Sequence, residues 1–147
     1  MWAFPFILLL LILDQSTKWF FNSEFALGES HAVIPNVFHL TLVHNTGVAF
    51  GMLQGLGQVI LILVAISIII VGVLLTRVKS RYEKIALGLV LAGAVGNLID
   101  RLSLGYVIDF LDFRVWPVFN VADICVSAGV GLIILQIIRG KRESDSV

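Results

Sequence analysis

The chain of 147 residues has one cysteine, few charged side chains and no excess charge of either sign. Cys125 cannot form an intrachain disulfide, and its place in an apolar run favours a small buried packing residue over a nucleophile. Its ten basic and ten acidic residues balance without a basic patch, so no nucleic-acid partner is expected. What the chain does have is apolar surface. With 59% hydrophobic residues it exceeds what one soluble core could hide, so lipid must solvate much of it.

Four apolar segments approach the length of about 20 helical residues that a hydrocarbon core of about 30 Å requires. We expect membrane spans near residues 3–21, 56–75, 82–102 and 121–138. The first segment has neither a basic n-region nor a small-residue cleavage site, so we interpret it as a retained helix. The sequence therefore predicts an all-α membrane protein, a four-helix bundle formed by a single domain over residues 1–147.

The distribution of basic residues predicts the orientation. Seven of the ten lie in the second-to-third connection and the tail: Arg77, Lys79, Arg81, Lys84, Arg139, Lys141 and Arg142. Short connections rich in Lys and Arg stay in the cytoplasm. Both termini are then cytoplasmic, and the segment 22–55 after the first helix lies outside.

Residues 30–52 of this outer segment are expected to form a small extracytoplasmic β-sheet. The stretch 38–43 alternates with a strand period, and the following HNTGVAFG has the Asn and Gly of a turn. His39 and His44 are far more consistent with ordinary strand or loop residues than with metal ligands. No metal-binding signature occurs, so no metal or cofactor is expected.

Acidic residues gather toward one end of the predicted bundle. With the orientation above, three helices place Asp14, Asp100 and Asp123 toward the outer membrane surface, and Asp109 and Asp112 lie in the connection between the last two helices. A carboxylate at the centre of a membrane helix costs about 2.5–3.5 kcal/mol, and less near the interface. This clustering predicts a functional site near the extracytoplasmic face.

Structural roles compete with chemical ones at the first helix and the third. Asp14 and Lys18 are spaced i, i+4 and could form an ion pair. Asp100 is expected to be held by a cation, either Arg101 or one on another segment, which favours an architectural role. The stripe that ends at Asp100 repeats small residues every four positions and predicts close helix packing; its members are Gly88, Ala92 and Gly96.

The same competition applies beside the fourth helix. Asn120 and Asp123 are candidates for capping its first turn, although capping alone does not easily account for both. Asp112 precedes Arg114 by two residues, so a surface ion pair is expected there. Asp109 has apolar neighbours and no adjacent cation.

The available chemistry favours a carboxylate pair. No spacing connects Cys125 or Ser127 to a histidine base, as nucleophilic catalysis would require. Two close carboxylates cannot both ionise, so they share a proton, as in aspartic proteases. Asp109 and Asp123 suit this role better than Asp100, because a permanently paired carboxylate would stay ionised.

Five short motifs occur in order along the chain: DQSTK (14–18), NTGVAF (45–50), GAVGNLIDR (93–101), VIDF (107–110) and FNVAD (119–123). On these motifs the sequence resembles the bacterial lipoprotein signal peptidases (signal peptidase II) along essentially its whole length. The resemblance implies a multi-pass aspartyl endopeptidase of the bacterial cytoplasmic (inner) membrane. It would remove the signal peptide of prolipoproteins just before a cysteine that carries diacylglycerol, at a site near the extracytoplasmic face.

The resemblance also implies roles for particular residues. The catalytic pair falls on Asp109 in VIDF and Asp123 in FNVAD, although a register error could exchange Asp109 with Asp112. The supporting and substrate-binding positions are Asp14, Lys18, Asn45, Gly47, Asn97, Asp100, Arg101 and Asn120. Diacylglyceryl-prolipoproteins and membrane lipid are the expected partners, inhibition by globomycin is expected, and nothing demands more than a monomer. The connection between Asp109 and Asp123 is shorter than the family's pattern leads us to expect, which implies a trimmed lid loop.

Two other functions are compatible with parts of this pattern. Acids within membrane helices are also typical of a small proton-coupled transporter or channel subunit. However, they gather at one interface here, and no series of polar residues continues inward. A non-catalytic scaffold would not explain Asp109, which lies outside the predicted helices.

Overall fold

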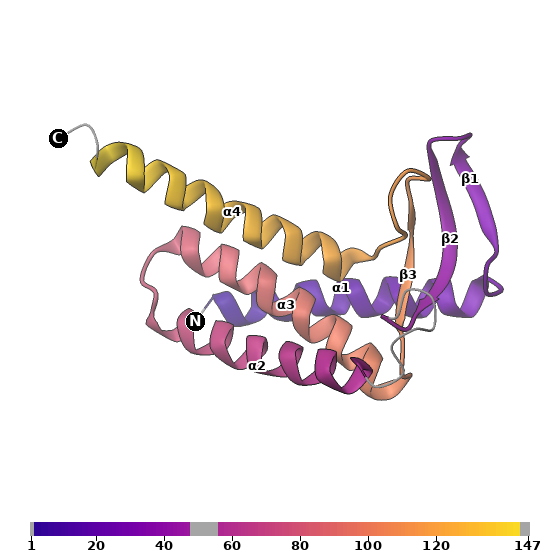
Figure 1. Ribbon diagram of the computed structural model, residues 1–147, viewed down its shortest axis with the longest axis horizontal. Coiled ribbons are helices and arrows are strands. Elements are labelled where there is room, and N and C mark those ends of the chain that lie inside the picture. The colour runs from indigo at the N-terminus through magenta and orange to yellow at the C-terminus, as the bar shows by residue number, and fades with distance from the viewer. Residues whose placement is uncertain (1, 48–55, 145–147) are drawn as a thin grey trace.

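A computed structural model of the chain describes residues 2–47 and 56–144 (Figure 1). Four helices, each with a stretch long and apolar enough to cross a membrane, form the body of the protein. They are α1 (Ala3–Glu24), α2 (Leu56–Arg77), α3 (Arg81–Ser103) and α4 (Val121–Ser144). The predicted four-helix architecture is confirmed. Each helix contains one of the predicted apolar segments and continues beyond it at one or both ends.

Helix α3 lies at the centre, where it packs against the other three helices. Its small residues allow this close approach. A Cβ atom added to Gly96 would lie 2.5 Å from the Asp14 carboxylate of α1, and one on Gly88 would touch the Phe6 ring. On the side facing α4, Gly93 leaves room for the backbone carbonyl of Ala122. The predicted small-residue stripe is therefore a packing surface, directed at α1.

Three antiparallel strands form a sheet in the order β1-β2-β3. The first two, β1 (Ser30–Ile34) and β2 (Phe38–Asn45), follow α1 as predicted. The third, β3 (Val107–Asp112), belongs to the connection between α3 and α4, for which the sequence predicts no secondary structure. Five of its six residues are buried on both faces of the strand, so the alternating pattern of a half-exposed strand is absent.

The expected outer segment 30–52 is partly within the described residues. After β2, the backbone N–H of Gly47, at φ 73°, donates a 2.8 Å hydrogen bond to Asn45 Oδ1, which begins the predicted turn. Residues 48–52 of that prediction lie outside the described part of the chain.

An apolar cluster joins the sheet to the end of α1. Phe21 of α1 stacks on Phe110 of β3 with ring centroids 4.1 Å apart, and Leu42 and Ile108 are buried beside them. The sheet stands across one end of the bundle, while the chain termini and the α2–α3 connection lie at the other end (Figure 1). The carboxylates predicted to cluster all lie at the end that carries the sheet.

Candidate active site

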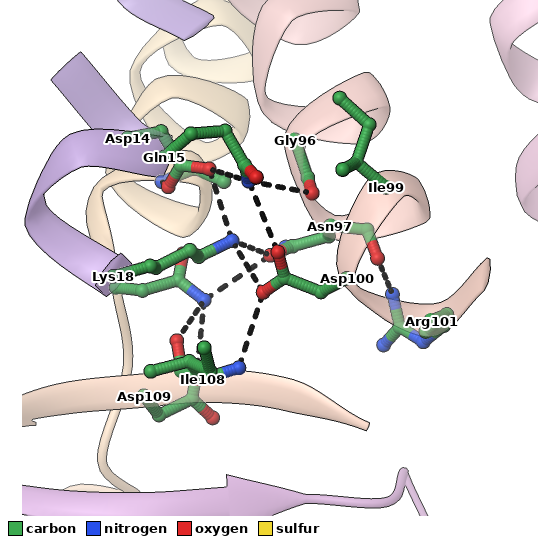
Figure 2. A network of polar contacts seen from close by, with 12 residues as sticks. Asp14, Gln15, Lys18, Gly96, Asn97, Ile99, Asp100, Arg101, Ile108 and Asp109 are labelled. Carbon is green, nitrogen blue, oxygen red and sulfur yellow. Dashed lines mark hydrogen bonds and ion pairs between the residues drawn. The ribbon is translucent and has the colours of Figure 1, made fainter. Parts of the chain in front are cut away.

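Lys18 is the centre of a buried polar network between α1 and α3 (Figure 2). Only 1% of the residue is exposed. Its ammonium group lies 3.0 Å from an oxygen of Asp14 and 3.0 Å from one of Asp100, and donates a 2.9 Å hydrogen bond to Asn97 Oδ1. Three acceptors satisfy its three N–H groups. The expected Asp14–Lys18 pair forms, and the cation that holds Asp100 is Lys18 rather than Arg101.

The carboxylates of Asp14 and Asp100 also accept hydrogen bonds from backbone N–H groups elsewhere in the chain. Asp14 Oδ1 accepts the N–H of Ala122 at 2.8 Å, and Asp100 Oδ2 accepts the N–H of Ile108 at 3.1 Å. Both therefore fix segments that carry the other two acids: the first turn of α4 and strand β3. This supports an architectural role for both residues.

Gln15, which was not among the predicted site residues, completes the α1–α3 contact. Its Nε2 donates to Asp14 Oδ2, to Asp100 Oδ1 and to the carbonyl oxygen of Gly96, at 3.1, 3.0 and 3.3 Å (Figure 2). Its place beside Asp14 in the DQSTK motif was the available signal.

Asn120 and Asp123 cap α4 reciprocally. The backbone N–H of Asp123 donates to Asn120 Oδ1 at 3.0 Å, and the N–H of Asn120 donates to Asp123 Oδ2 at 3.2 Å. This is the capping-box arrangement, in which two otherwise unpaired backbone donors are satisfied together. Capping thus accounts for both residues, contrary to the expectation that it would explain only one. It leaves Asp123 Oδ1 and the Asn120 amide for other partners.

Three asparagines direct their amide groups at the remaining two carboxylates. Asn97 accepts from Lys18, which can only donate, so its NH₂ group must face Asp123, at 2.9 Å. In the same way Asn120 accepts from a backbone N–H and donates to Asp109 Oδ1 at 2.6 Å. Asn45 accepts from the N–H of Gly47 and donates to Asp109 Oδ2 at 2.8 Å.

The same amides connect the two carboxylates. Asn120 Nδ2 also donates to Asn97 Oδ1 at 3.1 Å, so Asp109, Asn120, Asn97 and Asp123 form a continuous chain of hydrogen bonds. The donor and the acceptor of each of these hydrogen bonds are fixed, because the amide oxygens of Asn97 and Asn120 accept from groups that can only donate. The arrangement holds two acids from β3 and α4 at one place.

Burial raises the pKa of Asp109 from 3.8 to about 6. The hydrogen bond from Asn45 opposes this rise, the negative charge of Asp123 adds to it, and Asn120 and Lys18 lower the pKa again. The charges of the network explain why Lys18 lowers the pKa of Asp109 so little. Lys18 already contacts two carboxylates, so little positive charge remains for a third and a fourth.

Asp112, the alternative to Asp109, binds elsewhere. Its Oδ2 accepts from the Thr41 hydroxyl at 2.8 Å and from Arg114 at 2.9 Å. Burial opposes its ionisation, but the backbone N–H of Arg114, the Thr41 hydroxyl and the Arg114 side chain together hold its pKa below the usual value. The expected pair with Arg114 forms at the surface: the Arg114 side chain is 47% exposed, although Asp112 itself is only 5% exposed.

The other candidates occupy simpler places. Arg101 donates to the carbonyl oxygen of Asn97 at 3.3 Å and lines the same cavity as Asp123. Cys125 is buried in α4, as expected of a packing residue. His39 contacts Ser30, and His44 contacts Asn22 and stacks on Tyr106.

Comparison with known proteins identifies the family and the fold. A family model described as signal peptidase (SPase) II matches residues 6–139. The chain belongs to the signal peptidase II family.

Members of this family are similar to the chain over nearly its whole length. The lipoprotein signal peptidase of Halothermothrix orenii is 41% identical over 95% of this chain and 97% of its own, and that of Moorella thermoacetica is 45% identical over 91% and 93%. A solved bacterial membrane enzyme superposes with a TM-score of 0.79 at 32% identity, covering 95% of this chain and 88% of that one. Both sequence and fold therefore support the resemblance that the five motifs carry.

The side chains of nine of the ten residues that this resemblance implied for the site form hydrogen bonds or ion pairs within the network. These are Asp14, Lys18, Asn45, Asn97, Asp100, Arg101, Asp109, Asn120 and Asp123. Gly47 contributes through its backbone, which orients Asn45. Membership of the family does not favour the transporter or channel alternative.

Proposed function

We propose that this protein is an aspartic endopeptidase that removes the signal peptide from diacylglyceryl-modified prolipoproteins, with Asp109 and Asp123 as its catalytic pair. Membership of the signal peptidase II family supports the substrate class. The observation that carries the assignment of residues is the hydrogen-bonded chain of Asn120 and Asn97, which joins these two carboxylates.

The environment of Asp109 favours a proton on this carboxyl group. A pKa of about 6 for Asp109 means that this carboxyl group holds a proton more tightly than an exposed one. The ionised member of the pair takes a proton from water while the water oxygen bonds to the scissile carbonyl carbon, and the protonated member donates its proton to the carbonyl oxygen. The carboxyl group that took the proton from water then passes it to the peptide nitrogen, the other carboxylate takes a proton back from a hydroxyl group of the tetrahedral intermediate, and the C–N bond breaks. The products are the signal peptide with a new carboxyl terminus and a lipidated cysteine with a free amino group.

The network around Lys18 supports this chemistry without taking part in it. Asp14 and Asp100 share the ammonium group of Lys18, and their carboxylates also accept the backbone N–H groups that position α4 and β3. Asn45, Asn97 and Asn120 would hold the two catalytic carboxyl groups in place and offer polar groups to the substrate backbone. Arg101 lines the cavity beside Asp123 and would bind there as well.

We further propose that the enzyme spans the bacterial cytoplasmic (inner) membrane as a monomer, with the active site near the extracytoplasmic face. The basic residues of the α2–α3 connection and the end of α4 lie opposite the sheet, which supports cytoplasmic termini (Figure 1). At the outer interface both water and a lipid-anchored substrate are available. Inhibition by globomycin is expected.

Cleavage of a diacylglyceryl lipobox peptide by the purified protein in detergent tests the proposal. Asp109→Asn and Asp123→Asn should each abolish turnover while the protein stays folded. Asp112→Asn is the matched control in the same strand and should retain turnover. A wild-type protein that does not cut the peptide would refute the function, and activity in Asp109→Asn would refute the pair.

A further inference from the structure

Helices α2 and α4 both pack against α3, and in the described part of the chain they make at most marginal contact with each other (Figure 1). The surface of α3 between them is therefore the floor of a groove. Two cavities lie along this floor. The outer cavity, of about 280 Å³, borders Asp123, and the inner cavity, of about 500 Å³, lies at the opposite end of the same three helices.

Helical spacing shows that the two cavities belong to one groove. The α3 residues that line them are three, four or seven positions apart and so share one face of the helix; they are Glu83, Leu87, Ala94, Asn97 and Arg101. The same spacing applies on α2, where the lining residues are Val64, Ser67, Leu74 and Val78. The groove therefore follows one face of α3 from the candidate active site to the other end of the bundle.

The inner cavity is apolar except for Glu83 and Gln136. Gln136 Nε2 donates a 2.9 Å hydrogen bond to Glu83 Oε1, which joins α4 to the first turn of α3. Glu83 is half-buried, and no described residue forms an ion pair with it, although Arg81 and Lys84 are close in sequence. A carboxylate facing an apolar groove without a cation is costly, so a cation in the groove would be stabilised there.

We propose that Glu83, held by Gln136, binds a basic side chain near the N-terminus of the signal peptide and so contributes to substrate recognition far from the scissile bond. This inference rests on the proposed function. A secretory signal peptide begins with a positively charged n-region, which is followed by an apolar h-region of about 7–15 residues. When the scissile bond lies at Asp123 and the n-region stays in the cytoplasm, the h-region lies along the groove and the n-region at its inner end.

The length and the charge of the groove both fit this occupant. Helix α4 rises by about 20 Å between Asp123 and Gln136, at about 1.5 Å per residue. A helical h-region spans about 10–22 Å, so the n-region reaches the depth of Glu83. Lys79 and Arg81 are exposed at this end of the bundle and would repel a basic n-region. Among the described side chains that line the inner cavity, Glu83 carries the charge that attracts it.

The test uses two diacylglyceryl lipobox peptides that differ only in the n-region, which carries lysines in one and glutamines in the other. Glu83→Gln keeps an acceptor for Gln136 and removes the charge. At low salt it should raise KM for the lysine peptide by about threefold with kcat unchanged, because the contact is equal in the bound substrate and the transition state. The glutamine peptide should change by less than about 1.5-fold.

Two further variants make the test specific. Glu83→Lys should raise KM for the lysine peptide more than Glu83→Gln does, and a peptide with glutamates in its n-region should recover most of that loss. Glu24→Gln is the matched control, because Glu24 is exposed at the opposite end of the bundle and lines neither cavity. It should leave KM unchanged for every peptide.

The possible outcomes separate the proposals. A loss in Glu83→Gln that is confined to the lysine peptide and shrinks at high salt supports binding of the n-region. Equal losses on both peptides, as expected if Glu83 only joins α3 to α4 or binds a lipid headgroup, would overturn it, and so would no loss on either. Such results leave the proposed function intact, because the wild type still cuts. A wild type that cuts neither peptide refutes the proposed function and this inference together.

Discussion

Replacing Lys18 by methionine removes the cation that two buried carboxylates share. The ammonium group lies 3.0 Å from Asp14 and 3.0 Å from Asp100, and all three residues are at most 2% exposed. Breaking a buried ion pair by removing one partner costs about 3–5 kcal/mol, because a buried charge is left uncompensated. At about 2–4 °C per kcal/mol for a chain of this size, we expect the melting temperature to fall by about 6–20 °C.

Thermal unfolding of the purified variants in one detergent measures this effect. Lys79→Met is the matched control, because Lys79 is exposed at the other end of the bundle and should leave the melting temperature unchanged. The double variant Lys18→Met/Asp100→Asn should recover part of the loss, since it removes one of the two uncompensated charges. If Lys18→Met melts with the wild type, or if the double variant is less stable than Lys18→Met alone, the charge balance argued for this network is wrong.

Three further changes test other parts of the account. Folding raises the pKa of Asp109 from 3.8 to about 6, so the ionisation of this carboxyl group opposes folding. This destabilisation is absent below pH 3.8 and complete above pH 6. The stability of Asp109→Asn relative to wild type should therefore rise by up to about 3 kcal/mol between pH 4 and 7, and equal slopes in pH-dependent unfolding would contradict this. Asn45→Asp turns a donor into a like charge beside Asp109, which should raise the pKa of Asp109 further. The basic limb of the pH–rate profile, where the pair loses the proton that Asp109 holds, should move up by about one unit, and an unmoved limb would contradict the contact. Gly93→Ala should lower the melting temperature, because its Cβ would strike the backbone carbonyl of Ala122, whereas Gly131→Ala in open space should be neutral or stabilise by up to about 1 kcal/mol; equal effects would refute the packing.

The helices could be predicted from the sequence because each depends on a local property. A long apolar run suffices to identify a membrane helix, and the small residues at Gly88, Ala92 and Gly96 predict a packing face without naming the neighbour. Strand β3 could not be predicted in this way. Its burial on both faces hides the period, and its partner β2 lies more than sixty residues earlier in the chain.

The site was predictable in its members but not in its connections. The clustering of acids at one end follows from spans and orientation. In contrast, the pairing of Asp100 with Lys18 depends on how α1 packs on α3, which no local pattern records. Asp109 and Asp112 are three residues apart in one strand, and only the pairing of β3 shows that they bind different partners. The role of Gln15 could not be predicted, because a lone glutamine beside Asp14 has no spacing that indicates a contact between helices.

The capping box illustrates a further limit. Asn120 and Asp123 have the spacing of a cap and also the composition of an active site, and sequence reasoning treats these as competing interpretations. The structure combines them, because each side chain uses one oxygen for the cap and its other polar atom for the network. A residue can be structural and a candidate for catalysis at once.

The most direct test of the account is whether Asp109 and Asp123 titrate as a pair. Carboxyl ¹³C NMR of the protein labelled at aspartate, assigned through Asp109→Asn and Asp123→Asn, measures this. We expect Asp109 to titrate near pH 6 in the wild type and at lower pH in Asp123→Asn, where the neighbouring negative charge is absent. Titration near pH 3.8 in the wild type, or an unchanged midpoint in Asp123→Asn, would contradict the proposal that these two carboxylates form one catalytic unit.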